Sequence, residues 1–205
     1  MTIIAPVILA FDTSSSACTA ALFGASGNCL GKADRLIGRG HAERLVPMIA
    51  ELMDGRQADR IMVGVGPGSF TGIRVAIAAA HGLAIGWGAE LSGMSSLALL
   101  AAGNGTVAAA VQGGHGELFV QQFDDAANPT TELTNAPPAE AARLVTAQLV
   151  LGSGAAQLVG ARGWGEAREA WPSAANALLL PEALRLLAPK PVYARAPDAR
   201  VPEAA

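Results

Sequence analysis

The first half of the chain contains short hydrophobic runs that are separated by polar or glycine-containing turns. Residues 7–11 and 61–65 have the length and β-branched content of buried strands. Residues 17–23 form another apolar run, and a turn at 24–28 connects it to a less regular run at 29–36. We therefore expect a sheet that starts with a strand, a polar turn and a hairpin.

A helix is predicted over residues 71–87. It is apolar nearly all round, and Arg74 and His81 are its potentially charged groups. Helices of this kind are buried on several faces or packed against another chain. A chain of 205 residues has little interior in which to bury a whole helix. We therefore expect this helix at a subunit interface.

An amphipathic helix is predicted over residues 41–53. Its apolar side chains share one face, and they are Leu45, Met48, Ile49, Leu52 and Met53. Pro47 is expected near the first turn, where its missing N–H does little harm. The three histidines, His41, His81 and His115, stand alone in the sequence, so a zinc or iron site is not expected.

The sequence after residue 102 predicts a second lobe. Gly103-Asn104-Gly105 is the expected boundary, which divides the chain into lobes 1–103 and 104–205. The expected elements are strands at 106–111, 117–123 and 149–151, a loop at 124–138, a helix at 139–146, irregular structure at 160–173, an Ala/Leu-rich helix at 174–188 that Pro181 is able to split, and a proline-rich tail that packs in part. The sequence shows no internal repeat strong enough to use.

Composition narrows the class of protein. Hydrophobic residues make up 51% of the chain and charged residues 15%, so some apolar surface is expected to meet a partner. A net charge of −3 argues against a broad nucleic-acid surface of the chain's own. No membrane span and no signal peptide are expected. Cys18 and Cys29 are expected to be reduced thiols of a cytoplasmic protein.

Two turns that follow predicted strands form the candidate phosphate site. Their residues are Asp12, Thr13 and Ser14 in the first turn, and Gly66, Gly68 and Ser69 in the second. A glycine-rich turn into a helix exposes N–H groups that attract anions, and Ser69 or Thr71 can cap that helix. The spacing matches neither a P-loop nor the dinucleotide fingerprint. A tight packing turn is therefore the favoured alternative, in which Asp12 simply hydrogen-bonds its own turn.

Several segments together resemble the TsaB (YeaZ) family. They are Ile8-Leu-Ala-Phe-Asp-Thr-Ser14, His41-Ala-Glu-Arg-Leu-Val-Pro47, Gly66-Pro-Gly-Ser-Phe-Thr-Gly-Ile-Arg74, Gly116-Glu-Leu-Phe119 and Pro191-Val-Tyr-Ala-Arg195. The segments span nearly the whole chain, and the third is much more specific than a lone glycine motif. Where the family usually has Asp-Ala-Arg, this chain has Gln112-Gly-Gly-His115. Any role of that Asp and Arg is therefore lost or altered here.

The resemblance implies an α/β, actin-like (ribonuclease-H-like) two-lobe fold with mixed sheets flanked by helices and a shortened second lobe. It also implies a part in making N6-threonylcarbamoyladenosine at position 37 of tRNA. In that family the transfer is catalysed by TsaD, the ATPase TsaE joins the complex, and TsaB is a non-catalytic partner that meets tRNA through the complex. The resemblance further implies a homodimer when the chain is alone, no cofactor of its own, and ATP or ADP at the junction with TsaD.

The resemblance assigns the helices at 41–53 and 71–87 to partner contacts. The residues expected there are His41, Glu43, Leu45, Met48, Leu52, Thr71, Arg74, Val75, Ala78 and His81. Arg74 is expected in a specific pair and Phe70 in the core, while Glu117 and the second-lobe tryptophans are expected to be structural. Two alternatives stay open, an ATP-using phosphotransferase with Asp12 at the phosphates and a metalloprotease, for which the sequence offers no ligand set.

Overall fold

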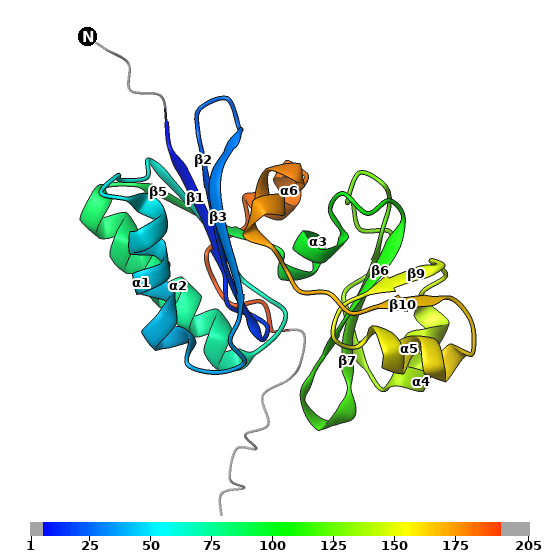
Figure 1. The fold of residues 1–205 in the computed structure, drawn as a ribbon. Coiled ribbons are helices and arrows are strands. Elements are labelled where there is room, and N and C mark those ends of the chain that lie inside the picture. The colour runs from blue at the N-terminus through cyan, green and yellow to red at the C-terminus, as the bar shows by residue number, and fades with distance from the viewer. Residues whose placement is uncertain (1–5, 194–205) are drawn as a thin grey trace, which may run out of the picture.

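The computed structural model describes residues 6–193, which form two lobes that each contain a five-stranded mixed sheet (Figure 1). The first sheet has the order β3-β2-β1-β4-β5. Its strands are β1 (Ile8–Asp12), β2 (Ala17–Phe23), β3 (Cys29–Leu36), β4 (Arg60–Gly64) and β5 (Glu90–Met94). β1 to β3 pair antiparallel, whereas β4 runs parallel to β1, and β5 runs parallel to β4. The sequence pattern predicted β1 to β4, and the structure confirms them.

The second sheet repeats the topology of the first. Its strands are β6 (Val107–Gln112), β7 (Leu118–Phe123), β8 (Thr134–Ala136), β9 (Leu149–Leu151) and β10 (Glu166–Arg168). The order β8-β7-β6-β9-β10 matches β3-β2-β1-β4-β5 strand for strand. The pairs β6/β7 and β7/β8 are antiparallel, and β6/β9 and β9/β10 are parallel. The two lobes are therefore copies in topology, although the sequence shows no usable repeat.

The helices and sheets form five layers (Figure 1). The helices α1 (His41–Met53) and α2 (Phe70–Trp87) cover the outer face of the first sheet, and α4 (Pro138–Leu144) and α5 (Ala155–Arg162) cover the outer face of the second. Between the sheets lie α3 (Ser96–Ala101), the 3₁₀ helix η2 (Ala174–Leu179) and α6 (Glu182–Arg185). A short 3₁₀ helix, η1 (Gly114–Gly116), makes the turn between β6 and β7.

The central strands of each sheet are buried on both faces, which explains their apolar runs. In β4, Ile61 and Val63 pack under α1 and α2, while Met62 points to the core between the sheets. In β6, Ala108 and Ala110 face α4 and α5, and Val107 faces the central core with its alternate neighbours. Successive side chains of a strand point to opposite faces. A strand that is covered on both sides therefore reads as uninterrupted hydrophobic sequence.

Several expectations for the second lobe are wrong. The stretch 160–173 is not irregular, because it contains the end of α5 and the strand β10, and the loop at 124–138 contains β8. β8 and β10 have three residues each and gain their hydrogen bonds from neighbouring strands, which a local pattern does not show. The helix at 174–188 is instead η2 followed by α6, since Pro181 separates them.

Two details of the first lobe also differ from expectation. Pro47 is the seventh residue of α1 rather than a first-turn residue, so the helix lacks one interior N–H donor. Phe70, which was expected in the core, is 56% exposed, because it begins α2 at the rim of the lobe.

In the part of the chain that the structure describes, α2 is the one helix long and apolar enough to cross a membrane. One side of it packs on β4 as a helix of the first lobe.

The end of the described chain closes the open edge of the first sheet. Leu187 exchanges backbone hydrogen bonds with Gly93 of the edge strand β5, and the Val192 N–H donates to the carbonyl of Val65 at 2.8 Å. Covering an edge in this way removes unpaired backbone groups. The first part of the predicted tail is therefore packed, and its residues 194–205 lie outside the described range.

Candidate functional site

The carboxylate of Asp12, at the end of β1, holds three elements together. Asp12 is fully buried, and its Oδ1 accepts hydrogen bonds from the backbone N–H and from the hydroxyl of Ser14, both at 2.7 Å. Its Oδ2 accepts from the hydroxyl of Ser96 at the start of α3. The Ser96 hydroxyl in turn accepts from the N–H of Gly66 at 3.0 Å. Both oxygens of the carboxylate are thus engaged within the protein.

The second turn packs directly on the first. The hydroxyl of Thr13 donates to the carbonyl of Gly72 at 2.7 Å, and the Ser69 N–H donates to the carbonyl of Ser14 at 2.7 Å. A Cβ at Gly72 would overlap the Thr13 carbonyl, so this glycine permits a close approach of two backbones. The Ser69 hydroxyl caps α2 by accepting from the Gly72 N–H at 3.2 Å, which settles the choice between Ser69 and Thr71.

The residues that the sequence proposed for phosphate binding do come together. Asp12, Thr13 and Ser14 meet the segment 66–69 at the ends of β1 and β4. Their polar groups bond mainly to one another, in the manner of the packing turn that was the favoured alternative. Nucleotide binding at these residues stays a prediction.

The outer side of α2 presents a row of exposed residues, which we name the α2 stripe. Its members follow helical spacing, and they are Thr71, Arg74, Ala78, His81, Gly82 and Ile85. Ile85 is 84% exposed, and the residues around it are small or apolar. Val75 is half-buried beside the stripe. Four of the expected contact residues of this helix thus lie on one open surface.

The prediction for α1 needs correction. Leu45 and Met48 are buried in the core under the helix, and His41 is 9% exposed, so these side chains are not open to a partner. The apolar face of an amphipathic helix packs first against its own sheet. Leu52 is half-buried and Glu43 is exposed. The His41 Nε2 is buried and has no hydrogen-bond partner within the described residues.

Arg74 lies over the ring of Phe70 and beside the ring of Tyr193, two aromatic residues that sequence reasoning did not connect with it. Its guanidinium carbon lies 3.7 Å from the ring centroid of Phe70 and 5.9 Å from that of Tyr193. Its Nε donates a hydrogen bond to the Tyr193 hydroxyl at 3.0 Å. Arg74 and Tyr193 are 119 positions apart, so no local sequence pattern indicates that they are in contact. The sequence shows only that each of them lies in a segment that resembles the family. The expected pairing of Arg74 is thus with aromatic rings and a phenol.

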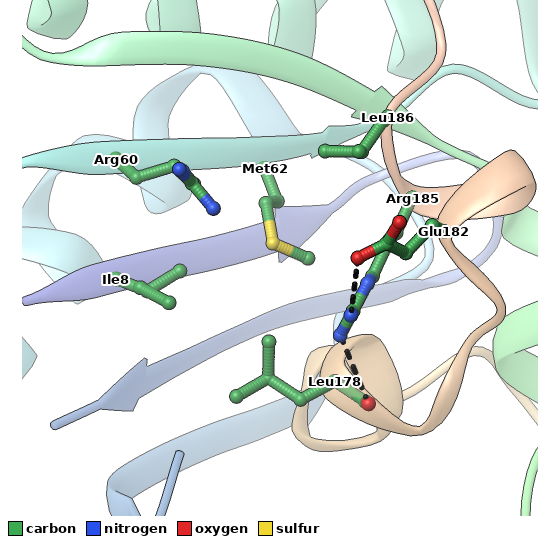
Figure 2. A pocket seen from close by; sticks show the side chains of 7 residues that line it. All are labelled: Ile8, Arg60, Met62, Leu178, Glu182, Arg185 and Leu186. Atoms are coloured by element: carbon green, nitrogen blue, oxygen red, sulfur yellow. Dashed lines mark hydrogen bonds and ion pairs between the residues drawn. The ribbon is translucent and has the colours of Figure 1, made fainter. Parts of the chain in front are cut away.

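A small pocket lies where α6 meets the face of the first sheet (Figure 2). It has a volume of about 170 Å³, and its lining consists of Ile8, Arg60, Met62, Leu178, Glu182, Arg185 and Leu186. Arg185 donates to the carbonyl of Leu178 at 3.2 Å and lies 3.7 Å from Glu182, while Arg60 pairs with Glu90 at 2.9 Å. Drug-sized ligands need pockets of roughly 300–1,000 Å³. The pocket is therefore a packing gap whose charges are already paired.

The altered loop of the second lobe is well bonded. Gln112 donates its N–H to the Ser153 hydroxyl at 3.1 Å, and the Gly113 N–H donates to the carbonyl of Glu117 at 2.8 Å. The carboxylate of Glu117 accepts from the Asn135 amide on β8, in agreement with a structural role. Trp164 is 45% exposed and packs one face of its ring against the guanidinium of Arg162 at 3.7 Å.

Nucleophile and metal chemistry find little support in the described residues. Burial raises the pKa of the Cys18 thiol to about 11, and the nearby Asp12 carboxylate adds to this, so the thiol is protonated at neutral pH. Among residues 6–193, no three His, Cys, Asp or Glu side chains gather as a metal site. The expected absence of a metal stays a prediction.

The two lobes have the same strand order, and the first has a polar turn after β1 and a glycine-rich turn between β4 and α2. These features define an actin-like two-lobe protein. Residues 34–158 match the family model described as "TsaD: tRNA N6-adenosine threonylcarbamoyltransferase". The chain belongs to this family. The resemblance to TsaB (YeaZ) that the motifs indicated is confirmed by the relatives that follow.

TsaB proteins are among the curated relatives. The chain is 33% identical over 127 residues to the Escherichia coli K12 protein named tRNA threonylcarbamoyladenosine biosynthesis protein TsaB, which covers 57% of this chain and 54% of that protein. It is 37% identical over 99 residues to the Haemophilus influenzae protein of the same name, which covers 46% of this chain and 41% of that one. The chain thus spans about half the length of the curated relatives it matches.

Two solved structures from Pseudomonas aeruginosa resemble the whole fold. One is an uncharacterized protein with similarity to the peptidase YeaZ, with a TM-score of 0.77 and 30% identity over 93% of this chain and 100% of that chain. The other is YeaZ, with a TM-score of 0.76 and 27% identity over 92% of this chain and 99% of that chain. The expected fold class is therefore confirmed over both lobes.

Proposed function

We propose that this chain is a non-catalytic subunit of the machinery that makes N6-threonylcarbamoyladenosine on tRNA. The names of the TsaB relatives and the family match support a part in this modification. In the proposal, the chain binds a TsaD-type catalytic subunit through the α2 stripe. A TsaE-type ATPase joins the same complex, and tRNA is contacted through the partners. The chain acts in the cytoplasm without a membrane contact.

The exposure of the α2 stripe is the observation that carries this proposal. Burial of one isoleucine side chain contributes about 1.5–3 kcal/mol, so a partner that covers Ile85, which is 84% exposed, would gain up to about this much. The glycine and alanine members of the stripe have short side chains, which allow a second helix to approach closely. The same surface would serve a homodimer when the chain is alone and a heterodimer when the catalytic subunit is present.

The hydrogen bonds of the Asp12 carboxylate favour a non-catalytic role over a catalytic one. A phosphotransferase needs a free carboxylate or donor groups at the phosphates, whereas both oxygens of Asp12 are bonded to Ser14 and Ser96. Neither the phosphotransferase nor the metalloprotease alternative gains an observation in its favour. The chain has no cofactor of its own in this proposal, and ATP or ADP binds at the junction with the catalytic subunit.

Light scattering on the chain alone and mixed with the TsaD-type subunit of the same organism tests the proposal. We expect a homodimer that exchanges into a heterodimer. Ile85→Arg places a charge on the stripe and should abolish both species while leaving the far-ultraviolet circular dichroism unchanged. Leu144→Arg, on the exposed side of α4 in the other lobe, is the matched control and should behave as wild type. An Ile85→Arg variant that still forms the heterodimer would refute docking through α2.

A further inference from the structure

Arg74 is held in a fixed position without an acidic partner in the described part of the chain. The guanidinium stacks on Phe70 and is fixed at Nε by the Tyr193 hydroxyl. The two rings lie 5.7 Å apart at 30°, so they support each other as well as the guanidinium. Within residues 6–193 no carboxylate forms an ion pair with Arg74, although four other arginines have one.

The cluster is open to solvent. Phe70 is 56% exposed and Tyr193 is 50% exposed, and Arg74 is exposed with them. Large aromatic side chains and arginine are the residue types that dominate binding energy at protein interfaces. The two exposed rings and the cation thus lie side by side on a chain that is short of charge. The cluster therefore has the composition of an interface anchor.

The stacking leaves one chemical function free. The Nε donor is used by Tyr193, and the two terminal nitrogens have no hydrogen-bond partner within the described residues. A guanidinium presents these nitrogens as a planar fork that fits a carboxylate. Holding the fork in place beforehand reduces the side-chain entropy that binding would cost.

We infer that Arg74 is an anchor for a carboxylate, from Asp or Glu, on the partner helix that docks along the α2 stripe. This inference rests on the proposed function and adds the chemistry of one contact to it. Arg74 is the one strongly basic residue of the stripe, so a complementary partner surface presents an acidic group here and small or apolar groups opposite Ala78 and Ile85. Tyr193, the last residue that the structure describes, is a positioning residue for Arg74.

The test measures the affinity of the full chain for the TsaD-type subunit at low and at moderate salt. We expect Arg74→Gln to weaken binding about 10- to 30-fold and to remove much of the salt dependence. Arg74→Lys, which keeps the charge but not the fork, should recover part of the loss. Tyr193→Phe keeps the ring and loses the acceptor, and it should weaken binding about threefold. Arg143→Gln, on α4 of the other lobe, is the matched control and should bind as wild type.

The variants separate failure of this inference from failure of the proposed function. If Ile85→Arg prevents binding but Arg74→Gln does not weaken it, docking through α2 stands and the anchor is overturned. If neither change affects binding, docking through α2 falls together with the anchor, and if the wild-type chain does not bind the TsaD-type subunit, the proposed function falls.

Two other occupants of Arg74 have distinct signatures, and either would overturn the inference. In the first case, inorganic phosphate weakens binding of the wild-type chain to the TsaD-type subunit, and Arg74→Gln weakens binding when ATP is present but not when it is absent. This result would assign the two terminal nitrogens of Arg74 to a phosphate. Tighter binding after Asp198→Asn and Glu203→Gln would show that the chain's own carboxylates occupy these nitrogens.

Substitution of the contacting partner carboxylate by Arg should restore the binding that Arg74→Glu loses.

Discussion

Gly64, the last residue of β4, lies directly against the buried carboxylate of Asp12. A Cβ at this position would lie 2.5 Å from the Asp12 Cγ and 2.9 Å from its Cβ. Both distances are far below van der Waals contact, and the carboxylate is fixed by hydrogen bonds from Ser14 and Ser96. Gly64→Ala therefore forces the carboxylate out of its place, although the backbone of Gly64 itself adopts an ordinary strand conformation.

The expected loss of stability follows from those hydrogen bonds. A hydrogen bond to a charged group contributes about 1.5–3 kcal/mol, and a buried donor left unpaired costs roughly 1–3 kcal/mol more. Losing one or two of the three bonds predicts a destabilisation of about 3–5 kcal/mol, a large part of a typical domain stability of about 5–15 kcal/mol. In an Asp12→Gly background the carboxylate and the Cβ are both gone, so Gly64→Ala should cost only about 1 kcal/mol there.

Urea denaturation at 25 °C, followed by circular dichroism, measures all four members of this double-mutant cycle. The predicted coupling between the two positions is at least about 2 kcal/mol. Gly160→Ala is the matched control, because nothing lies within 4 Å of the new methyl group and α5 is helical there, so it should be neutral or slightly stabilising. Equal costs of Gly64→Ala in both backgrounds would refute the contact, as would a cost below about 1 kcal/mol in the wild type.

Three further predictions concern the thiols and the second lobe. A thiol reagent at pH 8 should modify the exposed Cys29 quickly, whereas Cys18 should react after unfolding; rapid modification of both would contradict the burial of Cys18. Because folding raises the pKa of Cys18 to about 11, its contribution to stability is complete below about pH 9 and is lost as pH rises toward 11; Cys18→Ala should flatten the fall of the urea midpoint over that range. Arg162→Ala should lower the free energy of unfolding by about 2 kcal/mol, because Arg162 donates to the carbonyls of Ala147, Gln148 and Trp164, and thermal unfolding unchanged by the substitution would contradict this.

Local pattern was sufficient where an element is buried on both sides or has a strong helical period. β1, β2 and β4 are mostly apolar because a helix layer and the central core cover them. The bounds predicted for α1 match the structure, and those for α2 differ by one residue. The apolar helix predicted at 71–87 is the strongest single feature of the sequence. In the structure this helix carries the exposed α2 stripe.

Pattern was insufficient where an element owes its existence to its neighbours. β8 and β10 are three residues long, and each is held by pairing with one adjacent strand. The repeated topology of the lobes is likewise invisible in the sequence, because strand order depends on which strands pair and not on which residues they contain. Leu45 and Met48 of α1 were wrong as partner contacts for a related reason, since they pack under their own helix.

The sequence by itself determined where most strands and helices lie, the family of the chain, and the apolar character of α2, because these depend on residues close together in the chain. Tertiary structure decided the state of the candidate site. It placed Ser96 against Asp12 across 84 positions and Tyr193 against Arg74 across 119. A hydroxyl or a ring in the sequence can bond to many partners, and folding selects one by bringing distant segments within a few ångströms. As a result, both oxygens of Asp12 are hydrogen-bonded within the protein, whereas Arg74 is exposed on the surface of α2.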